Sequence, residues 1–176
     1  MDYCLRGLWS LEGLRSLDLS DNLLEGEISK GNNGLSNLRG ISLRNNQFTG
    51  DVPDGIGDCL LLRSVDLSEN FLSGGLPRLM QKLTLCNDLV LHKNRFTEEL
   101  LEWIGDMRSL VTLDLSENNF RCQIPNAVGK LKSLNFLNVS KNGLTGSMPE
   151  SMSNCLNLLV LDISHNSLIG NLPFWV

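Results

Sequence analysis

One nine-residue pattern decides the fold, and it is clearest in Leu110-Val111-Thr112-Leu113-Asp114-Leu115-Ser116-Glu117-Asn118. The pattern occurs seven times, and each copy ends in an asparagine that lies 24 residues after the asparagine of the preceding copy. The seven asparagines are Asn22, Asn46, Asn70, Asn94, Asn118, Asn142 and Asn166. A fixed period of this length indicates repeated structural units that stack on one another.

Each copy predicts a short strand followed by an inward turn. The leucines alternate with other residues, as expected for a strand with one packed face and one open face. A strand this short buries too little apolar surface alone, so neighbouring coils must stack into a parallel sheet with a spacing of about 4.8 Å. The asparagine amide both donates and accepts, and we expect it to satisfy the backbone groups of the turn.

A second motif follows each asparagine and predicts how the chain returns. It is clearest in Leu144-Thr145-Gly146-Ser147-Met148-Pro149, where glycine permits a positive φ and proline fixes φ. An apolar residue ten positions after the asparagine is expected to pack inward: Ile56, Met80, Ile104, Val128 and Met152. Some copies depart from this motif: Ser29 replaces the proline, Asn32 replaces the apolar residue, and 97–101 lack both glycine and proline.

Together these motifs resemble the plant extracellular class of leucine-rich repeats. Three short stretches have sequences similar to those in the ectodomains of plant receptor-like kinases: Leu8-Trp9-Ser10-Leu11, Asp21-Asn22 and Glu102-Trp103-Ile104-Gly105. The resemblance covers nearly the whole chain, from about Cys4 to Val176.

The predicted fold is a leucine-rich-repeat solenoid. We expect a right-handed, curved stack of coils with a parallel β-sheet on the concave face and 3-10 or irregular segments on the convex side. The predicted organisation is one solenoid over residues 1–176, with a partial repeat at 1–13 and both terminal caps absent. Full repeats are predicted to start near residues 14, 38, 62, 86, 110, 134 and 158.

Composition excludes several classes of function. The formal net charge of −5 argues against wholesale nucleic-acid binding. No window of about 18 apolar residues predicts a membrane span, and the first residues lack the layout of a secretory signal. The five cysteines, an odd number without C-x-x-C spacing, argue against a disulfide framework or a zinc site. We therefore expect the cysteines to act as small, buried apolar residues.

Catalytic chemistry is not expected. The two histidines, His92 and His165, lie three coils apart, or roughly 15 Å. No nucleophile, base and orienting acid can assemble across that distance, and no nucleotide-binding, metalloprotease or kinase motif is present. The aspartates at every second coil, including Asp66 and Asp114, would lie roughly 10 Å apart, too far to share a calcium ion. We therefore predict no enzyme activity, no metal and no cofactor.

A ligand is expected on the concave sheet, where some residues differ from the repetitive serine and aspartate background. The candidates are Arg44, Asp88, Val90, His92, Lys93, Phe136, Lys141 and His165. Arg44, His92 and Lys93 predict a basic zone for a carboxylate, and Phe136 beside Val160 predicts an apolar spot. The alternative is that these are ordinary solvated side chains.

Two further features have alternative interpretations. The stacked arginines Arg15, Arg39 and Arg63 either attract an anion or are screened by neighbouring carboxylates such as Asp66. Asn138-Val139-Ser140 is the sole glycosylation sequon, and a glycan on Asn138 would obstruct the concave face.

The leading functional hypothesis is a protein- or peptide-recognition module. The resemblance implies a receptor-like kinase or receptor-like protein ectodomain at the extracellular side of the plasma membrane, with a peptide or protein ligand and a leucine-rich-repeat co-receptor as partners. It implies no direct membrane insertion by this chain. The alternatives are a truncated remnant without a ligand, or one piece of a receptor kinase gene product whose kinase domain lies elsewhere.

Overall fold

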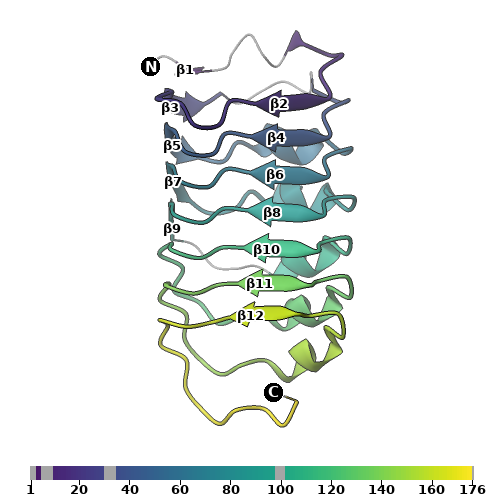
Figure 1. Ribbon diagram of the computed structural model, residues 1–176, viewed down its shortest axis with the longest axis vertical. Coiled ribbons are helices and arrows are strands. Elements are labelled where there is room, and N and C mark those ends of the chain that lie inside the picture. The colour runs from purple at the N-terminus through teal and green to yellow at the C-terminus, as the bar shows by residue number, and fades with distance from the viewer. Residues whose placement is uncertain (1–2, 5–9, 30–34, 98–101, 176) are drawn as a thin grey trace.

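The computed structural model describes residues 3–4, 10–29, 35–97 and 102–175. Successive coils stack along one axis, with the first coils at one end and the last at the other (Figure 1). Asn32 and residues 98–101, where the sequence departs from the repeat motif, lie outside the described residues.

A seven-stranded parallel sheet runs along one side of the stack. Its strands are β2 (Ser16–Asp18), β4 (Gly40–Ser42), β6 (Ser64–Asp66), β8 (Asp88–Val90), β10 (Thr112–Asp114), β11 (Phe136–Asn138) and β12 (Val160–Asp162). The strands follow one another in chain order, and each residue pairs with the residue 24 positions away, as Leu113 does with Leu89 and Leu137. This sheet confirms the predicted parallel strands.

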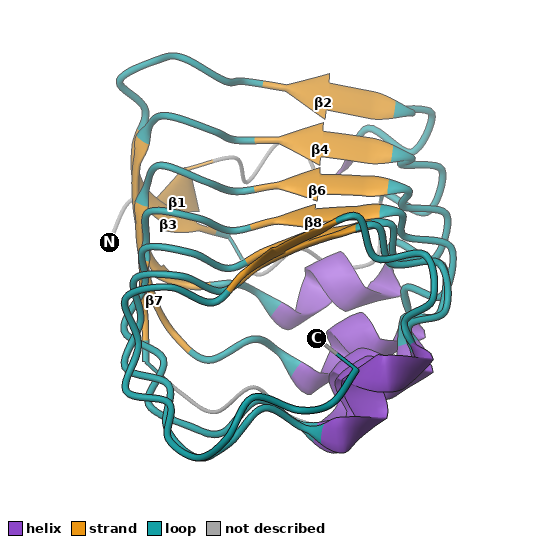
Figure 2. Ribbon diagram, turned by 60° about the horizontal axis from the view of Figure 1, so that its bottom comes forward, coloured by secondary structure: helices purple, strands orange, loops and turns teal. Residues whose placement is uncertain are grey.

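A second parallel sheet was not predicted. It contains β1 (Tyr3–Cys4), β3 (Glu25–Ile28), β5 (Gln47–Asp51), β7 (Phe71–Gly74) and β9 (Arg95–Phe96), in that order. It covers a different side of the coil from the first sheet (Figure 2). The sequence predicted only a bend here, because glycine normally weakens a strand.

Glycine is tolerated in this second sheet because it makes room for a neighbouring side chain. Gly50 has a φ of +75°, and a Cβ placed there would lie 2.9 Å from the side chain of Glu27 on the preceding coil. Gly74 has the same relation to Asp51. The glycines therefore serve the close stacking of coils as well as the bend.

Short 3-10 helices lie on the side of the coil opposite the first sheet (Figure 2). They are η2 (Asp54–Asp58), η3 (Arg78–Lys82), η4 (Glu102–Asp106), η5 (Asn126–Lys130) and η6 (Glu150–Asn154). Pro53, Pro77, Pro125 and Pro149 precede four of them in extended conformation, with φ between −63° and −72°. The prediction of 3-10 segments on this side is confirmed.

A continuous core fills the space between the sheets and the helices. The five residues expected to pack inward, from Ile56 to Met152, are each at most 3% exposed. Phe96 and Phe120 stack across neighbouring coils with ring centroids 6.2 Å apart. The side chains of Cys59, Cys86, Cys122 and Cys155 are buried, as expected for small apolar residues.

Candidate functional site

The asparagines tie consecutive coils together. The Asn70 side-chain nitrogen donates to the backbone oxygens of Leu43, Leu67 and Ser68 at 2.9–3.2 Å, and its oxygen accepts from the backbone N–H of Phe48 at 3.0 Å. The asparagines from Asn46 to Asn166 repeat these contacts, whereas Asn22 donates, among the described residues, to Leu19 and Ser20 of its own coil. The ladder holds the backbone that presents the first sheet.

We call the outward side of the seven-stranded sheet, with the turn after each strand, the strand face. In most coils an aspartate or asparagine on the strand accepts hydrogen bonds from a serine two residues later. Asp66, for example, accepts from the backbone N–H of Ser68 at 3.0 Å and from its hydroxyl. Such bonds lower the pKa values of Asp18 and Asp162. The hydrogen bonds from the hydroxyls of Ser20 and Ser164 are the main causes of the lowering. The carboxylates that suggested calcium are thus part of the local turns.

Two coils lack this aspartate–serine turn. In the β4 coil, Ser42 and Arg44 occupy the positions of the aspartate and the serine, and in the β8 coil Val90 and His92 occupy them. Val90 lies between Asp66 and Asp114 in the sheet and is partly buried, as are Asp88 and His92. These coils give up local hydrogen bonds, so their outward side chains distinguish this part of the strand face.

The residue before each asparagine adopts a left-handed conformation. Its φ is 50–56° in all seven coils, at Asp21, Asn45, Glu69, Lys93, Glu117, Lys141 and His165. The turn therefore places a column of mostly charged side chains along the edge of the strand face. Asp21 accepts a hydrogen bond from the side chain of Asn45 at 2.9 Å, and Lys141 pairs with Glu117 at 3.2 Å.

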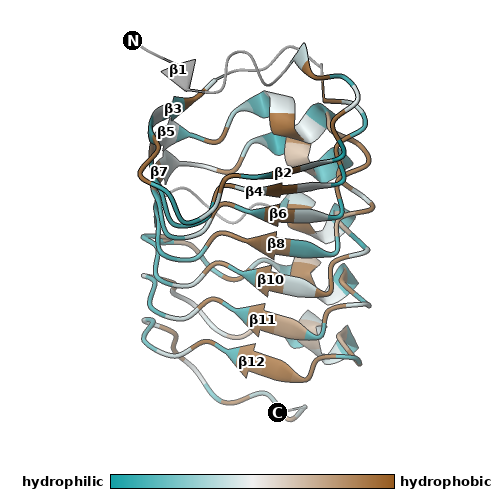
Figure 3. Ribbon diagram, turned by 45° about the horizontal axis from the view of Figure 1, so that its top comes forward, coloured by the Kyte–Doolittle hydropathy of each residue, from teal (hydrophilic) through white to brown (hydrophobic). Residues whose placement is uncertain are grey.

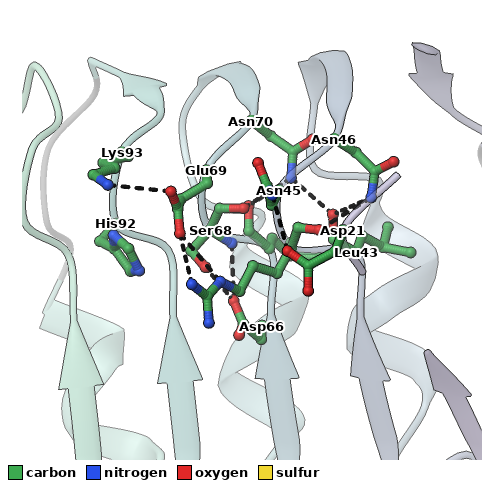
Figure 4. Close-up of polar contacts among 12 residues, drawn as sticks. Asp21, Leu43, Asn45, Asn46, Asp66, Ser68, Glu69, Asn70, His92 and Lys93 are labelled. Carbon is green, nitrogen blue, oxygen red and sulfur yellow. Dashed lines mark hydrogen bonds and ion pairs between the residues drawn. The ribbon is translucent and has the colours of Figure 1, made fainter. Parts of the chain in front are cut away.

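The predicted basic zone contains a carboxylate that the sequence interpretation missed. Glu69 lies between Arg44 and Lys93 and forms ion pairs with them at 2.9 and 3.1 Å (Figure 4). The hydrogen bond from Lys93 is the main cause of the lowered pKa of Glu69, and Arg44 contributes less. His92 lies beside Lys93 on the same coil (Figure 4). The zone is therefore an Arg44–Glu69–Lys93 cluster, and comparing residues 24 apart would have identified Glu69 as a neighbour of Lys93.

Phe136 and His165 lie on coils away from this cluster. Phe136 pairs in register with Val160, which is 46% exposed, and hydrophobic residues colour much of strands β11 and β12 brown (Figure 3). His165 is exposed on the last described coil of the sheet. The strand face thus has a charged part around Glu69 and an apolar part around Phe136.

The sequon asparagine takes part in a local turn. Asn138 accepts hydrogen bonds from the backbone N–H of Ser140 at 3.0 Å and from its hydroxyl at 2.8 Å, and Ser140 is 5% exposed. Glycosylation at Asn138 stays a prediction.

The stacked arginines lie on consecutive coils. The backbone N–H of Arg39 donates to Arg15, and that of Arg63 donates to Arg39, both at 2.7 Å. All three side chains are exposed, and none forms an ion pair with a described residue, so the expected screening carboxylates are not in direct contact.

The described residues form neither a metal-binding cluster nor a membrane-spanning helix. Within the described ranges, no group of three histidine, cysteine or acidic side chains could hold a metal ion. No helix among the described residues has the length and apolar character needed to cross a membrane.

The coil stack, the asparagine ladder and the variable strand face define a leucine-rich-repeat solenoid. Models described as leucine-rich repeats match residues 13–35, 37–59, 61–83 and 157–176, and residues 85–144. The chain belongs to the leucine-rich-repeat family, and its structural relatives identify it as similar to plant receptor ectodomains. A search among curated proteins gave no match.

Three solved structures illustrate this similarity. The plant peptide hormone receptor RGFR1 in complex with RGF2 is 34% identical over 93% of this chain, with a TM-score of 0.91. The ectodomain of the Arabidopsis thaliana receptor kinase GASSHO1/SCHENGEN3, in complex with CASPARIAN STRIP INTEGRITY FACTOR 2, is 37% identical over 91% (TM-score 0.88). The Arabidopsis receptor kinase HAESA, in complex with the peptide hormone IDA and the co-receptor SERK1, is 30% identical over 97% (TM-score 0.92). The chain spans 26%, 19% and 29% of these three chains, respectively.

Proposed function

We propose that this chain is a recognition segment of a plant receptor ectodomain and binds a peptide or protein on its strand face. The related ectodomains in the comparison are complexes with peptide ligands, which supports a binding role rather than catalysis. By the same analogy, the segment would act at the extracellular side of the plasma membrane, and a second leucine-rich-repeat receptor would be its co-receptor.

The single observation that carries this placement is the loss of the aspartate–serine turn in two coils. Arg44 and His92 stand where other coils have a serine that is bound locally. Arg44 is half exposed and its guanidinium contacts only one carboxylate, Glu69, among the described residues. An acidic group of a ligand would compete with Glu69 for Arg44 and Lys93, since exposed ion pairs contribute only about 0.2–1 kcal/mol each.

The proposed ligand has an acidic group and an apolar group. The acidic group would bind near Arg44, His92 and Lys93, and an aliphatic or aromatic side chain would pack on Phe136 and Val160. Asp88 and Val90 lie on the same coil as His92 and Lys93, while Lys141 and His165 border the apolar part. This arrangement suits an extended peptide that crosses several coils, because the strand face is open along its length.

The test is binding of a peptide library to the chain with terminal caps grafted from a related ectodomain. Arg44→Ala combined with Lys93→Ala should weaken binding of acidic peptides about tenfold or more. Arg78→Ala combined with Lys82→Ala, on η3 at the opposite side, removes the same charge and should change affinity less than about twofold. Unchanged binding by the first pair would show that the site is placed wrongly.

A further inference from the structure

A cluster of cations lies on the side of the coil opposite the strand face. Arg108, Gly129, Lys130, Lys132 and Asn154 line an open hollow of about 570 Å³, which we call the basic hollow. It is formed by the residues at and just beyond the ends of η4, η5 and η6. Among the residues that the structure describes, three cationic side chains and no carboxylate line it.

Two cations of the basic hollow, like Arg15, Arg39 and Arg63, have no carboxylate partner among the described residues, unlike the paired cations of the strand face. On the strand face, Arg44, Lys93 and Lys141 each pair with a glutamate. Within the described part of the chain, Arg108 and Lys130 form no ion pair. These charges are therefore available to an outside anion.

A comparison between coils sharpens this contrast. Lys82 at the end of η3 pairs at 3.0 Å with Asp58, which lies 24 residues earlier. Lys130 occupies the corresponding position at the end of η5, and Asp106 lies 24 residues before it, yet these two form no such pair. The η5 coil therefore leaves the ammonium group of Lys130 free where the η3 coil does not.

The other residues that line the basic hollow indicate which further groups a bound anionic ligand would carry. Lys132 donates to the backbone oxygen of Asn154 at 3.2 Å, which directs its ammonium group along the hollow. The Asn154 side-chain amide is exposed and forms no hydrogen bond with a described residue, so it can both donate to and accept from a ligand hydroxyl. Cations beside a free amide suit a ligand that carries both carboxylates and hydroxyls.

We propose that the basic hollow binds an acidic oligosaccharide, with carboxylates at Arg108, Lys130 and Lys132 and a hydroxyl at Asn154. The guanidinium of Arg108 would bind one carboxylate through two parallel hydrogen bonds, while the lysines act as point charges. This site is separate from the strand face and does not depend on the proposed peptide ligand.

The test uses calorimetric titration of the 176-residue chain with a trimer of galacturonic acid. The double variant Arg108→Gln with Lys130→Gln should weaken binding about tenfold or more, because two charge-assisted contacts are lost. The matched control is Arg78→Gln with Arg121→Gln, which removes the same net charge at two exposed positions outside the hollow. It should change affinity less than about twofold. Circular dichroism spectra check that all variants keep the fold.

Ligand controls separate a built site from general attraction between charges. A neutral galactose trimer and sodium sulfate should each bind far more weakly than the acidic trimer. In nuclear magnetic resonance titrations, the amides of Gly129 and Asn154 should shift, while those of His92 and Lys93 should not. Equal weakening by both double variants, equal binding of the neutral trimer or sulfate, or shifts confined to the strand face would each overturn the proposal.

Discussion

The asparagine ladder predicts a position-dependent cost when an asparagine is replaced by a leucine of similar shape. Asn70 is 5% exposed, and the backbone N–H of Phe48 has the Asn70 oxygen as its partner. In Asn70→Leu, that buried N–H is left without an acceptor, which costs about 1–3 kcal/mol.

The backbone carbonyl groups that accept hydrogen bonds from Asn70 keep other partners in the variant, so they contribute less to the lost stability than the N–H group. Leu43 still accepts from the side chain of Asn46 at 3.2 Å, and Leu67 from that of Asn94 at 2.9 Å. The backbone N–H of Asn45 still reaches Ser68 at 3.0 Å. We therefore expect a total loss of about 2–3 kcal/mol in the free energy of unfolding, dominated by the orphaned N–H.

The matched control is Asn22→Leu. Asn22 is exposed, and its oxygen accepts no hydrogen bond from a described residue. We expect a loss of less than about 1 kcal/mol, because water can solvate the freed carbonyl groups. Urea unfolding followed by circular dichroism measures both values, with the slope compared to confirm that the same transition is observed. Equal losses in the two variants would refute the reasoning.

Three further predictions concern an ion-paired carboxylate, a buried thiol and a glycine at a close contact between coils. The ion pairs of Glu69 lower its pKa, so they stabilise the fold fully above the pKa of an unfolded glutamate, about 4.3. This stability is lost as the pH falls through the pKa of Glu69 in the folded chain. Carboxyl titration by nuclear magnetic resonance should show that Lys93→Ala raises the pKa of Glu69. Burial raises the pKa of Cys86 to about 12, so iodoacetamide at pH 8 should modify this thiol only as the chain unfolds, and rapid labelling of the folded chain would contradict its burial. Gly129→Ala places a Cβ against the backbone of the next coil and should cost about 1–3 kcal/mol by thermal unfolding, whereas Gly13→Ala, with nothing within 4 Å, should cost less than about 0.5 kcal/mol.

The sequence by itself determined the coil and its period. Each short strand, each asparagine turn and each inward residue such as Ile56 is specified within one 24-residue unit. Because every unit has the same pattern, the register between coils follows directly, and Leu113 pairs with Leu89 as the period requires. The candidate residues of the strand face could be selected for the same reason, since their outward direction depends only on the alternation along the strand.

Only the tertiary structure decided which side chains meet between coils. Glu69 accepts both Arg44 and Lys93, which converts a predicted basic zone into a paired cluster. The basic hollow around Lys130 likewise depends on the distance between neighbouring coils rather than on a motif within one. These features depend on side-chain conformation and on the spacing of stacked backbones, and neither is encoded in the periodic pattern of a single repeat.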